Sequence, residues 1–305
     1  MALRRPALAA AFALVSFAAA TVFAQNADLS PGPKEGSSYR FGLSERLEIR
    51  TMSKSLPGGS QLHVMQSDVL MRVKSLPAEP EGPVYEVTFD RVKFVSQHPT
   101  AKRNPAFDTG APADEAAGNE LAPVLLPLLN KPIRVSLDTS GRLREVRTPD
   151  QSLIPDVDFA GIGRQFFMPE WIGPRLLPVV SMGTAETAAA VGTRWSIPSE
   201  SPVLFGVDQP MNISTEFVVR EIQPGQIARV ELSGTATLQP QRSGDPVSAK
   251  LDSLAVTGEA VWDLQSRIMG QILATTTWAV QTSPGENLEV RTENIRRLHV
   301  ARLQD

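Results

Sequence analysis

The sequence predicts a mainly β protein: antiparallel meanders forming a long curved sheet, a half-barrel or two packed β-rich halves, with a few short helices. Three observations support this class. Long stretches alternate apolar and polar residues, as strands with one buried face do. Turn signals rich in Gly, Pro and Ser separate these stretches. With 305 residues, 42% of them hydrophobic, the chain can also bury a sizeable core.

The first strands are expected in residues 39–53, 61–76 and 83–97. The short polar turns between them favour an antiparallel meander with one buried face. Residues 96–120 break the alternation with Pro, Gly and small side chains, which predicts a loop. Order is expected to begin near Tyr39, because the residues before it are rich in Ser, Pro, Gly and charge.

A short Leu-rich helix is expected in residues 119–130, with Asn119 as its cap and Pro127 limiting its length. A hairpin follows over 132–147, with Gly141 at the left-handed position of its turn. The strand pattern resumes after residue 190 in six further stretches: 193–200, 211–223, 226–239, 254–265, 267–281 and 288–303.

This organisation predicts five segments along the chain. They are a signal peptide (1–24), a flexible leader (25–38), a first β-rich half (39–150), an apolar helical connection (151–190) and a second β-rich half (191–305). The two halves share a weak sequence similarity. In each half, a strand and a turn that begins with Asp are followed by an Arg that begins the next strand. Such hairpins also arise by chance, so the sequence leaves a duplication open.

The first 24 residues have the three regions of a secretory signal peptide. Arg4 and Arg5 precede an apolar run over 7–23, and Ala24 closes a small-residue cleavage site. An uncleaved membrane anchor is the alternative, but the run is Ala-rich and short for a span of about 20 residues. The chain has no Cys, which excludes disulfides and a lipid-modified Cys. We therefore expect export to the periplasm or the extracellular space.

Composition and motifs exclude several classes of function. The formal net charge is −3 with acids and bases interleaved, so we expect no nucleic-acid partner. The three His residues, His63, His98 and His299, are too scattered for a metal motif or an evident catalytic triad. The sequence contains no phosphate-binding, dinucleotide-binding or serine-hydrolase motif, so we assign no cofactor and no catalytic residue.

One motif favours an enzyme. Asp108-Thr109-Gly110 followed by Ala is the sequence motif of the catalytic loop of an aspartic peptidase. That chemistry needs two carboxylates that share a proton, each held in a buried loop. Asp108 instead follows a polar, Pro-containing stretch, and Asp138, the internal candidate for the second acid, lacks a Gly directly after Thr139. A peptidase-like hydrolase is therefore the alternative function, and we expect Asp108 to shape a turn.

The feature that suggests binding is a dense group of large apolar side chains in the helical connection. A helix packed on a sheet is the plainer interpretation of such a group. The functional interpretation is a lid over an apolar cavity. It assigns ligand contacts to Phe166, Phe167, Met168, Trp171 and Leu176.

Five short motifs recur in a known pattern: "YRF" at Tyr39–Phe41, the loop Phe107–Thr109, the helix 121–129, the strand and turn 137–143, and Gly192-x-x-Trp195. They resemble a family of uncharacterised bacterial secreted proteins and lipoproteins, found in planctomycetes and Bacteroidetes. The family has no assigned activity, so the resemblance implies no functional residues. The architecture is similar to the lipoprotein-carrier half-barrels of the bacterial envelope, whose concave sheet holds acyl chains.

Together these observations predict a secreted or periplasmic, non-enzymatic envelope protein. Its expected partner is an apolar small molecule or lipid, or another envelope protein. An exposed apolar patch or an open sheet edge would favour the protein partner.

Overall fold

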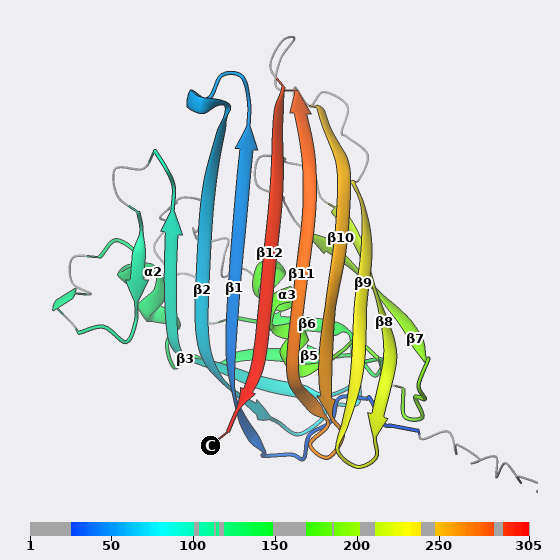
Figure 1. The fold of residues 1–305 in the computed structure, drawn as a ribbon. Coiled ribbons are helices and arrows are strands. Elements are labelled where there is room, and N and C mark those ends of the chain that lie inside the picture. Colours follow the sequence, from blue (N-terminus) through cyan, green and yellow to red (C-terminus); the bar gives the residue numbers. More distant parts are fainter. Residues whose placement is uncertain are drawn as a thin grey trace, which may run out of the picture.

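The computed structural model describes residues 26–100, 104–112, 114–115, 119–148, 169–184, 186–201, 211–238, 248–283 and 289–304. Within them, twelve strands form one open antiparallel sheet in the order β6-β5-β3-β2-β1-β12-β11-β10-β9-β8-β7, with β4 paired to β3 (Figure 1). This confirms the prediction of a mainly β fold built as a long curved sheet. The predicted signal peptide lies outside the described residues.

The strands follow the chain in two runs. The first run is β1 (Ser38–Met52), β2 (Ser60–Ser75), β3 (Val84–Gln97), β4 (Ala106–Asp108), β5 (Ile133–Leu137) and β6 (Leu143–Arg147). The second is β7 (Arg194–Ser201), β8 (Met211–Gln223), β9 (Ile227–Leu238), β10 (Ser248–Asp263), β11 (Ile268–Ser283) and β12 (Val290–Leu303). The helical segments are η1 (Pro57–Gly59), α2 (Ala122–Leu125), η2 (Leu126–Leu128) and α3 (Pro169–Val180).

Strand β1 lies in the middle of the sheet and joins the two runs. It pairs with β2 on one side and with β12 on the other, so the first and the last strand are neighbours. From β1 the chain moves outward to the edge strand β6, and from the other edge strand, β7, it moves back to the centre at β12. The two runs of strands are therefore continuous parts of one sheet.

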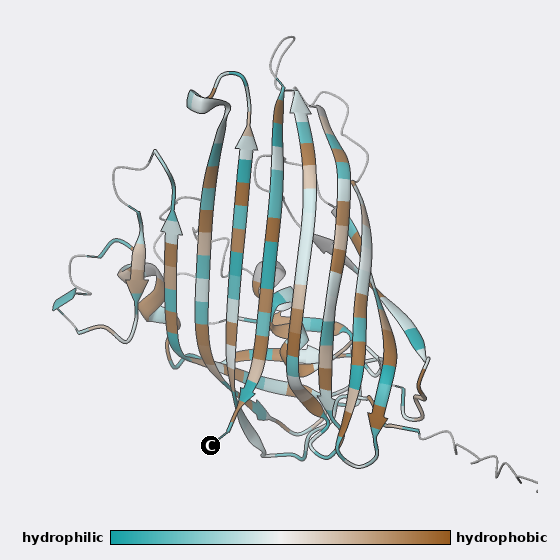
Figure 2. Cartoon of the chain, in the orientation of Figure 1, coloured by the Kyte–Doolittle hydropathy of each residue, from teal (hydrophilic) through white to brown (hydrophobic). Residues whose placement is uncertain are grey.

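The two faces of the sheet differ in polarity. In β1, Phe41 and Leu43 are buried on one face, whereas Arg40 and Arg46 are exposed on the other. Figure 2 shows the same alternation as hydrophobic and hydrophilic bands along the strands. Helix α3 covers part of the buried face, where it contacts β6 and β11, and β5 and β6 pass behind the lower ends of the central strands (Figure 1). We call this buried side the inner face.

Residues 26–37 pack at the lower end of the sheet in Figure 1, although their composition predicted a flexible leader. Leu29 is fully buried, and Ala27 forms a backbone bridge with Ala189. The guanidinium of Arg267, in the β10–β11 turn, donates to the backbone carbonyl of Ser30. This packing corrects the prediction of a flexible leader. That prediction rested on the polar composition of the segment, which also contains two apolar residues of the main core, Ala27 and Leu29.

The hairpin follows the predicted local signals, and the short helix follows them in part. Asp138 Oδ1 accepts the backbone N–H of Arg142 at 2.9 Å, and Gly141 has a φ of 77°. Leu121, not the predicted Asn119, is the N-cap of α2 and has no side-chain cap, although Asn119 Oδ1 accepts the backbone N–H of Leu121 at 2.9 Å. The Pro-containing sequence keeps α2 to 4 residues. None of the helices in the described part of the chain combines the length and the apolar character needed to cross a bilayer.

Candidate ligand-binding face

Of the five residues predicted to contact a ligand, the structure describes the surroundings of one. Leu176 lies in α3, is 2% exposed and belongs to the main hydrophobic core. Phe166, Phe167 and Met168 lie outside the described residues, and so does the side chain of Trp171. Leu176 therefore makes the helix-on-sheet contact of the plainer interpretation.

A second apolar cluster lies on the inner face, at the upper ends of β8 to β11 in Figure 1. Trp278 and Val280 are its buried members, and the residues that pack around them are half-buried. This cluster therefore keeps apolar side-chain surface that the main core does not. We call it the upper cluster, and it consists of Leu47, Ile213, Ala236, Leu238, Ala249, Leu251, Leu254, Trp278 and Val280.

A charged cluster lies beside the upper cluster on the inner face. Glu45 of β1 is 8% exposed and accepts Arg175 Nε of α3 at 3.1 Å and Arg296 Nε of β12 at 2.6 Å. Burial alone would raise the pKa of Glu45, but the two guanidinium groups outweigh burial and hold that pKa at about 2. The carboxylate is charged at neutral pH, so the three side chains together carry one net positive charge.

The strand register explains why Glu45 points inward among apolar neighbours. Because side chains alternate along a strand, Leu43, Glu45 and Leu47 share the inner face. Arg296 stands opposite Leu47 in the pairing of β1 with β12, and α3 brings Arg175 to the same carboxylate. The ion pairs therefore hold α3 against the sheet where the first strand, β1, pairs with the last strand, β12.

Two further polar groups lie next to Arg296 on the inner face. Asn294 precedes Arg296 by two residues on β12, and Trp278 of β11 stands opposite Asn294. Trp278 Nε1 and Asn294 Oδ1 are buried and have no hydrogen-bond partner among the described residues. Each such buried group costs about 1–3 kcal/mol. A donor and an acceptor thus lie within the apolar surface, beside a cation.

The Asp-Thr-Gly motif holds β4 against β3. The Asp108 carboxylate accepts Arg91 Nε at 2.7 Å and the backbone N–H of Gly110 at 2.9 Å, and Thr109 Oγ1 accepts the backbone N–H of Val92 at 2.8 Å. The hydrogen bond from Arg91 is the main cause that keeps the pKa of Asp108 below its ordinary value. An aspartic dyad must instead share a proton between two acids. This geometry gives Asp108 a turn-forming role.

A Ser and a His that lie far apart in the sequence meet on the inner face. His63 Nε2 lies 2.7 Å from Ser96 Oγ, and the ring of His98 lies edge-on at 5.1 Å from that of His63. Burial, and then the neighbouring His98, lower the pKa of His63. A catalytic Ser must reach its substrate and its His needs an orienting acid, but Ser96 is 2% exposed and no described acid bonds His63. The contact joins β2 to β3.

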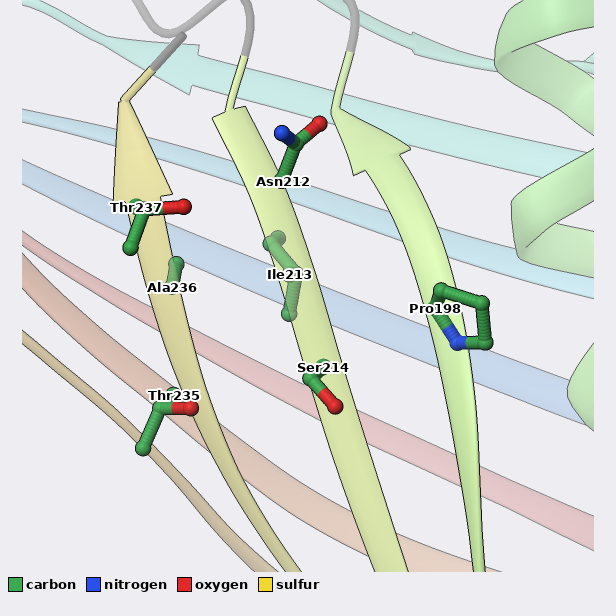
Figure 3. Close-up of a pocket in the computed structure, with 7 residues that line it drawn as sticks. All are labelled: Pro198, Asn212, Ile213, Ser214, Thr235, Ala236 and Thr237. Atoms are coloured by element: carbon green, nitrogen blue, oxygen red, sulfur yellow. The ribbon is translucent and has the colours of Figure 1, made fainter.

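The outer face has a shallow hollow near the upper ends of β7, β8 and β9 (Figure 3). Asn212, Ser214, Thr235 and Thr237 line it, with Pro198 on the edge strand. These side chains can form hydrogen bonds, but none of them titrates near neutral pH to activate a hydroxyl. The described residues also contain no group of three or more His, Asp or Glu that could hold a metal ion.

Comparison with known proteins finds a similar fold but no matching family. No model of a known protein family and no curated protein matches the sequence. A structure described as "Lipid-protein interactions in lipovitellin" matches with a TM-score of 0.51 at 10% identity, over 90% of this chain. The chain spans 26% of that lipovitellin chain. Pseudomonas aeruginosa OpdQ matches with a TM-score of 0.26 at 10% identity, over 88% of this chain and 98% of its own, a similarity too low to carry an argument.

The lipovitellin match shows a shared sheet architecture, within which the inner face is the distinctive surface. Sequence reasoning missed this face because the upper cluster draws its members from β1 and from β8 to β11. One signal was present in the sequence. Glu45 occupies an inward position of an alternating strand, and a charge at such a position needs partners on the same face.

Proposed function

We propose that this chain is an exported, non-enzymatic envelope protein that binds an apolar ligand on the inner face of its sheet. The upper cluster carries the proposal. Its residues are mostly half-buried, whereas the main hydrophobic core on the same face consists of buried side chains. Covering apolar surface is favourable by about 25 cal/mol per Å², so a ligand that lies on this cluster gains free energy.

Two other observations support parts of the proposal. The protein that shares this sheet architecture, lipovitellin, is described by its lipid–protein interactions. This description agrees with a lipid-binding role for the shared architecture, although at 10% identity the ligand does not transfer with the fold. Export rests on the signal-peptide pattern of residues 1–24 and agrees with a chain that contains no Cys.

A partner polypeptide is the second class of ligand that the sequence predicts. It would add a strand at an open edge of the sheet, such as β7. Pro198 lies within β7 and has no N–H to offer a further strand, which disfavours pairing at that edge. The apolar small molecule is therefore the better supported ligand.

Binding of N-phenyl-1-naphthylamine, a neutral dye that brightens in apolar surroundings, tests the proposal. Leu254→Gln places an amide in the upper cluster, whereas Leu273→Gln changes a residue of the adjacent strand that is 48% exposed on the outer face. We expect the Leu254→Gln chain to bind the dye about tenfold more weakly, since a buried Leu contributes about 1.5–3 kcal/mol. We expect the Leu273→Gln chain to bind like the wild type.

The midpoint of urea unfolding, measured for each variant, establishes that the compared chains are folded. A wild-type chain that does not bind the dye would contradict the proposal. So would folded variants that bind the dye equally well, because the dye would then lie away from the upper cluster.

A further inference from the structure

We infer that the ligand of the inner face is an anionic amphiphile, whose charged head group binds Arg296 and Trp278 Nε1 while its apolar chain covers the upper cluster. The inference rests on the proposed function and adds the chemical class of the ligand. It combines three features of the inner face: a cation with unused donors, a buried donor and acceptor beside it, and a continuous path to apolar surface.

The cation is Arg296. Glu45 accepts one Nε–H from Arg296 and one from Arg175. A guanidinium carries five N–H donors, and Arg296 makes no other hydrogen bond within the part of the chain that the structure describes. Its side chain is 33% exposed, so its terminal nitrogens can bind an anionic oxygen.

The second donor is the indole of Trp278. Its Nε1–H can only donate, so it requires an acceptor such as a carboxylate or phosphate oxygen. Asn294, which is 3% exposed and faces Trp278 across the strands, adds Oδ1 as an acceptor for a head-group hydroxyl. The Cα atoms of Asn294 and Arg296 lie about 7 Å apart along one face of β12, which is the span of a small head group.

Leu47 connects the head-group contacts to the apolar surface. It stands opposite Arg296 in the strand pairing and packs in the upper cluster with Trp278. A ligand with its head at Arg296 can therefore extend its chain over β11 and toward β8. Arg297, the next residue, faces outward and pairs with Glu48 at 2.6 Å, so it provides a matched control on the opposite face.

Palmitic acid and methyl palmitate test the inference, because they share a chain and differ in head-group charge. Each displaces N-phenyl-1-naphthylamine from the full chain at pH 7. We expect palmitate to bind at least about tenfold more tightly than methyl palmitate, as a charge-assisted hydrogen bond predicts. Arg296→Gln should remove this preference and leave methyl palmitate binding within about twofold, while Arg297→Gln should leave both unchanged.

Trp278→Phe provides a second variant that leaves the Glu45 cluster intact. It keeps an aromatic ring and removes Nε1–H, so we expect palmitate to lose about fivefold more affinity than methyl palmitate loses. Trp262→Phe is the control, since Trp262 is fully buried in the main core and its Nε1 also lacks a partner among the described residues. It should leave both affinities unchanged.

The outcomes separate this inference from the proposed function. If the wild type binds the dye and methyl palmitate but prefers neither palmitate nor palmitoyl lysophosphatidic acid to methyl palmitate, the anionic head group is refuted and apolar binding stands. Equal losses of both probes in Arg296→Gln would also overturn the inference. If the wild type binds none of the probes, the proposed function itself fails. Palmitoyl lysophosphatidic acid then distinguishes a phosphate from a carboxylate head, and tighter binding than methyl palmitate by either anion supports the inference.

Discussion

Glu45→Gln removes the negative charge that holds Arg175 and Arg296 on the inner face. The amide has nearly the same size as the carboxylate and can still accept a hydrogen bond, so the substitution isolates the charge. Both guanidinium groups then lie on an apolar surface without the carboxylate that each now contacts. We expect the free energy of unfolding to fall.

The pKa of Glu45 sets the size of this loss. The ordinary value is 4.5, and the folded protein holds it at about 2. The difference of roughly 2.5 corresponds to ~3 kcal/mol of stability at neutral pH. Removing one partner of a buried ion pair costs about 3–5 kcal/mol in general, which agrees with this value.

Urea unfolding followed by Trp fluorescence measures the loss, and Glu48→Gln is the matched control. Glu48 lies on the same strand but faces outward, where it contacts Arg46 and Arg297 and keeps 22% of its side chain exposed. Such exposed pairs contribute at most about 1 kcal/mol, because water and salt screen them. Glu45→Gln should therefore destabilise the protein at least about twice as much as Glu48→Gln.

The pH dependence of the unfolding free energy tests the direction of this pKa shift. The pKa of Glu45 is lower in the folded than in the unfolded chain, so its contribution is fully present above pH 4.5 and is lost as the pH falls through about 2. The stability difference between wild type and Glu45→Gln should shrink over that range. A difference below about 1 kcal/mol at pH 7, or one that does not change with pH, would refute the reasoning.

Three other substitutions test single features. Leu29→Ala should cost about 2–5 kcal/mol in urea unfolding, because Leu29 is fully buried, and a negligible cost would mean that residues 26–37 do not pack as described. Gly141→Ala should lower the free energy of unfolding more than Gly36→Ala, although the two glycines have nearly the same φ, 77° and 76°. A Cβ at Gly141 would lie 2.9 Å from the Thr184 carbonyl oxygen, whereas a Cβ at Gly36 would have no atom within 4 Å. Equal unfolding midpoints for the two variants would contradict this. Asp108→Asn should bind the dye like the wild type and should cleave casein no differently from the wild type. If the wild type cleaves casein and the variant does not, the peptidase alternative is restored.

Local patterns were sufficient to predict the long strands and the turns, but not the short strand β4 (Ala106–Asp108), which lies in the stretch 96–120 predicted as a loop. Alternation predicted a strand over 39–53, and β1 spans Ser38–Met52. The Asp-led turn of the β5–β6 hairpin was predictable because Asp138 and Gly141 satisfy it within a few residues. These features depend on neighbouring residues, so the sequence contains them directly.

The inner face depends on contacts that no local pattern contains. Glu45 and Arg296 lie 251 residues apart, and they meet because β1 pairs with β12. An alternating pattern indicates which residues share a face of one strand, but it does not indicate which strand lies beside it. The cluster that the sequence did highlight, at Phe166 to Leu176, owes its prominence to being contiguous in the chain.

Photo-crosslinking with a fatty acid that carries a diazirine near the end of its chain tests most directly whether the inner face binds an apolar ligand. After irradiation of the full chain, mass spectrometry of peptides locates the attachment. We expect labels on inward-facing residues of the upper cluster, such as Ile213, Leu238 and Leu254. Labels confined to exposed outer-face residues, such as Leu62 and Leu273, or no labels at all, would contradict the account.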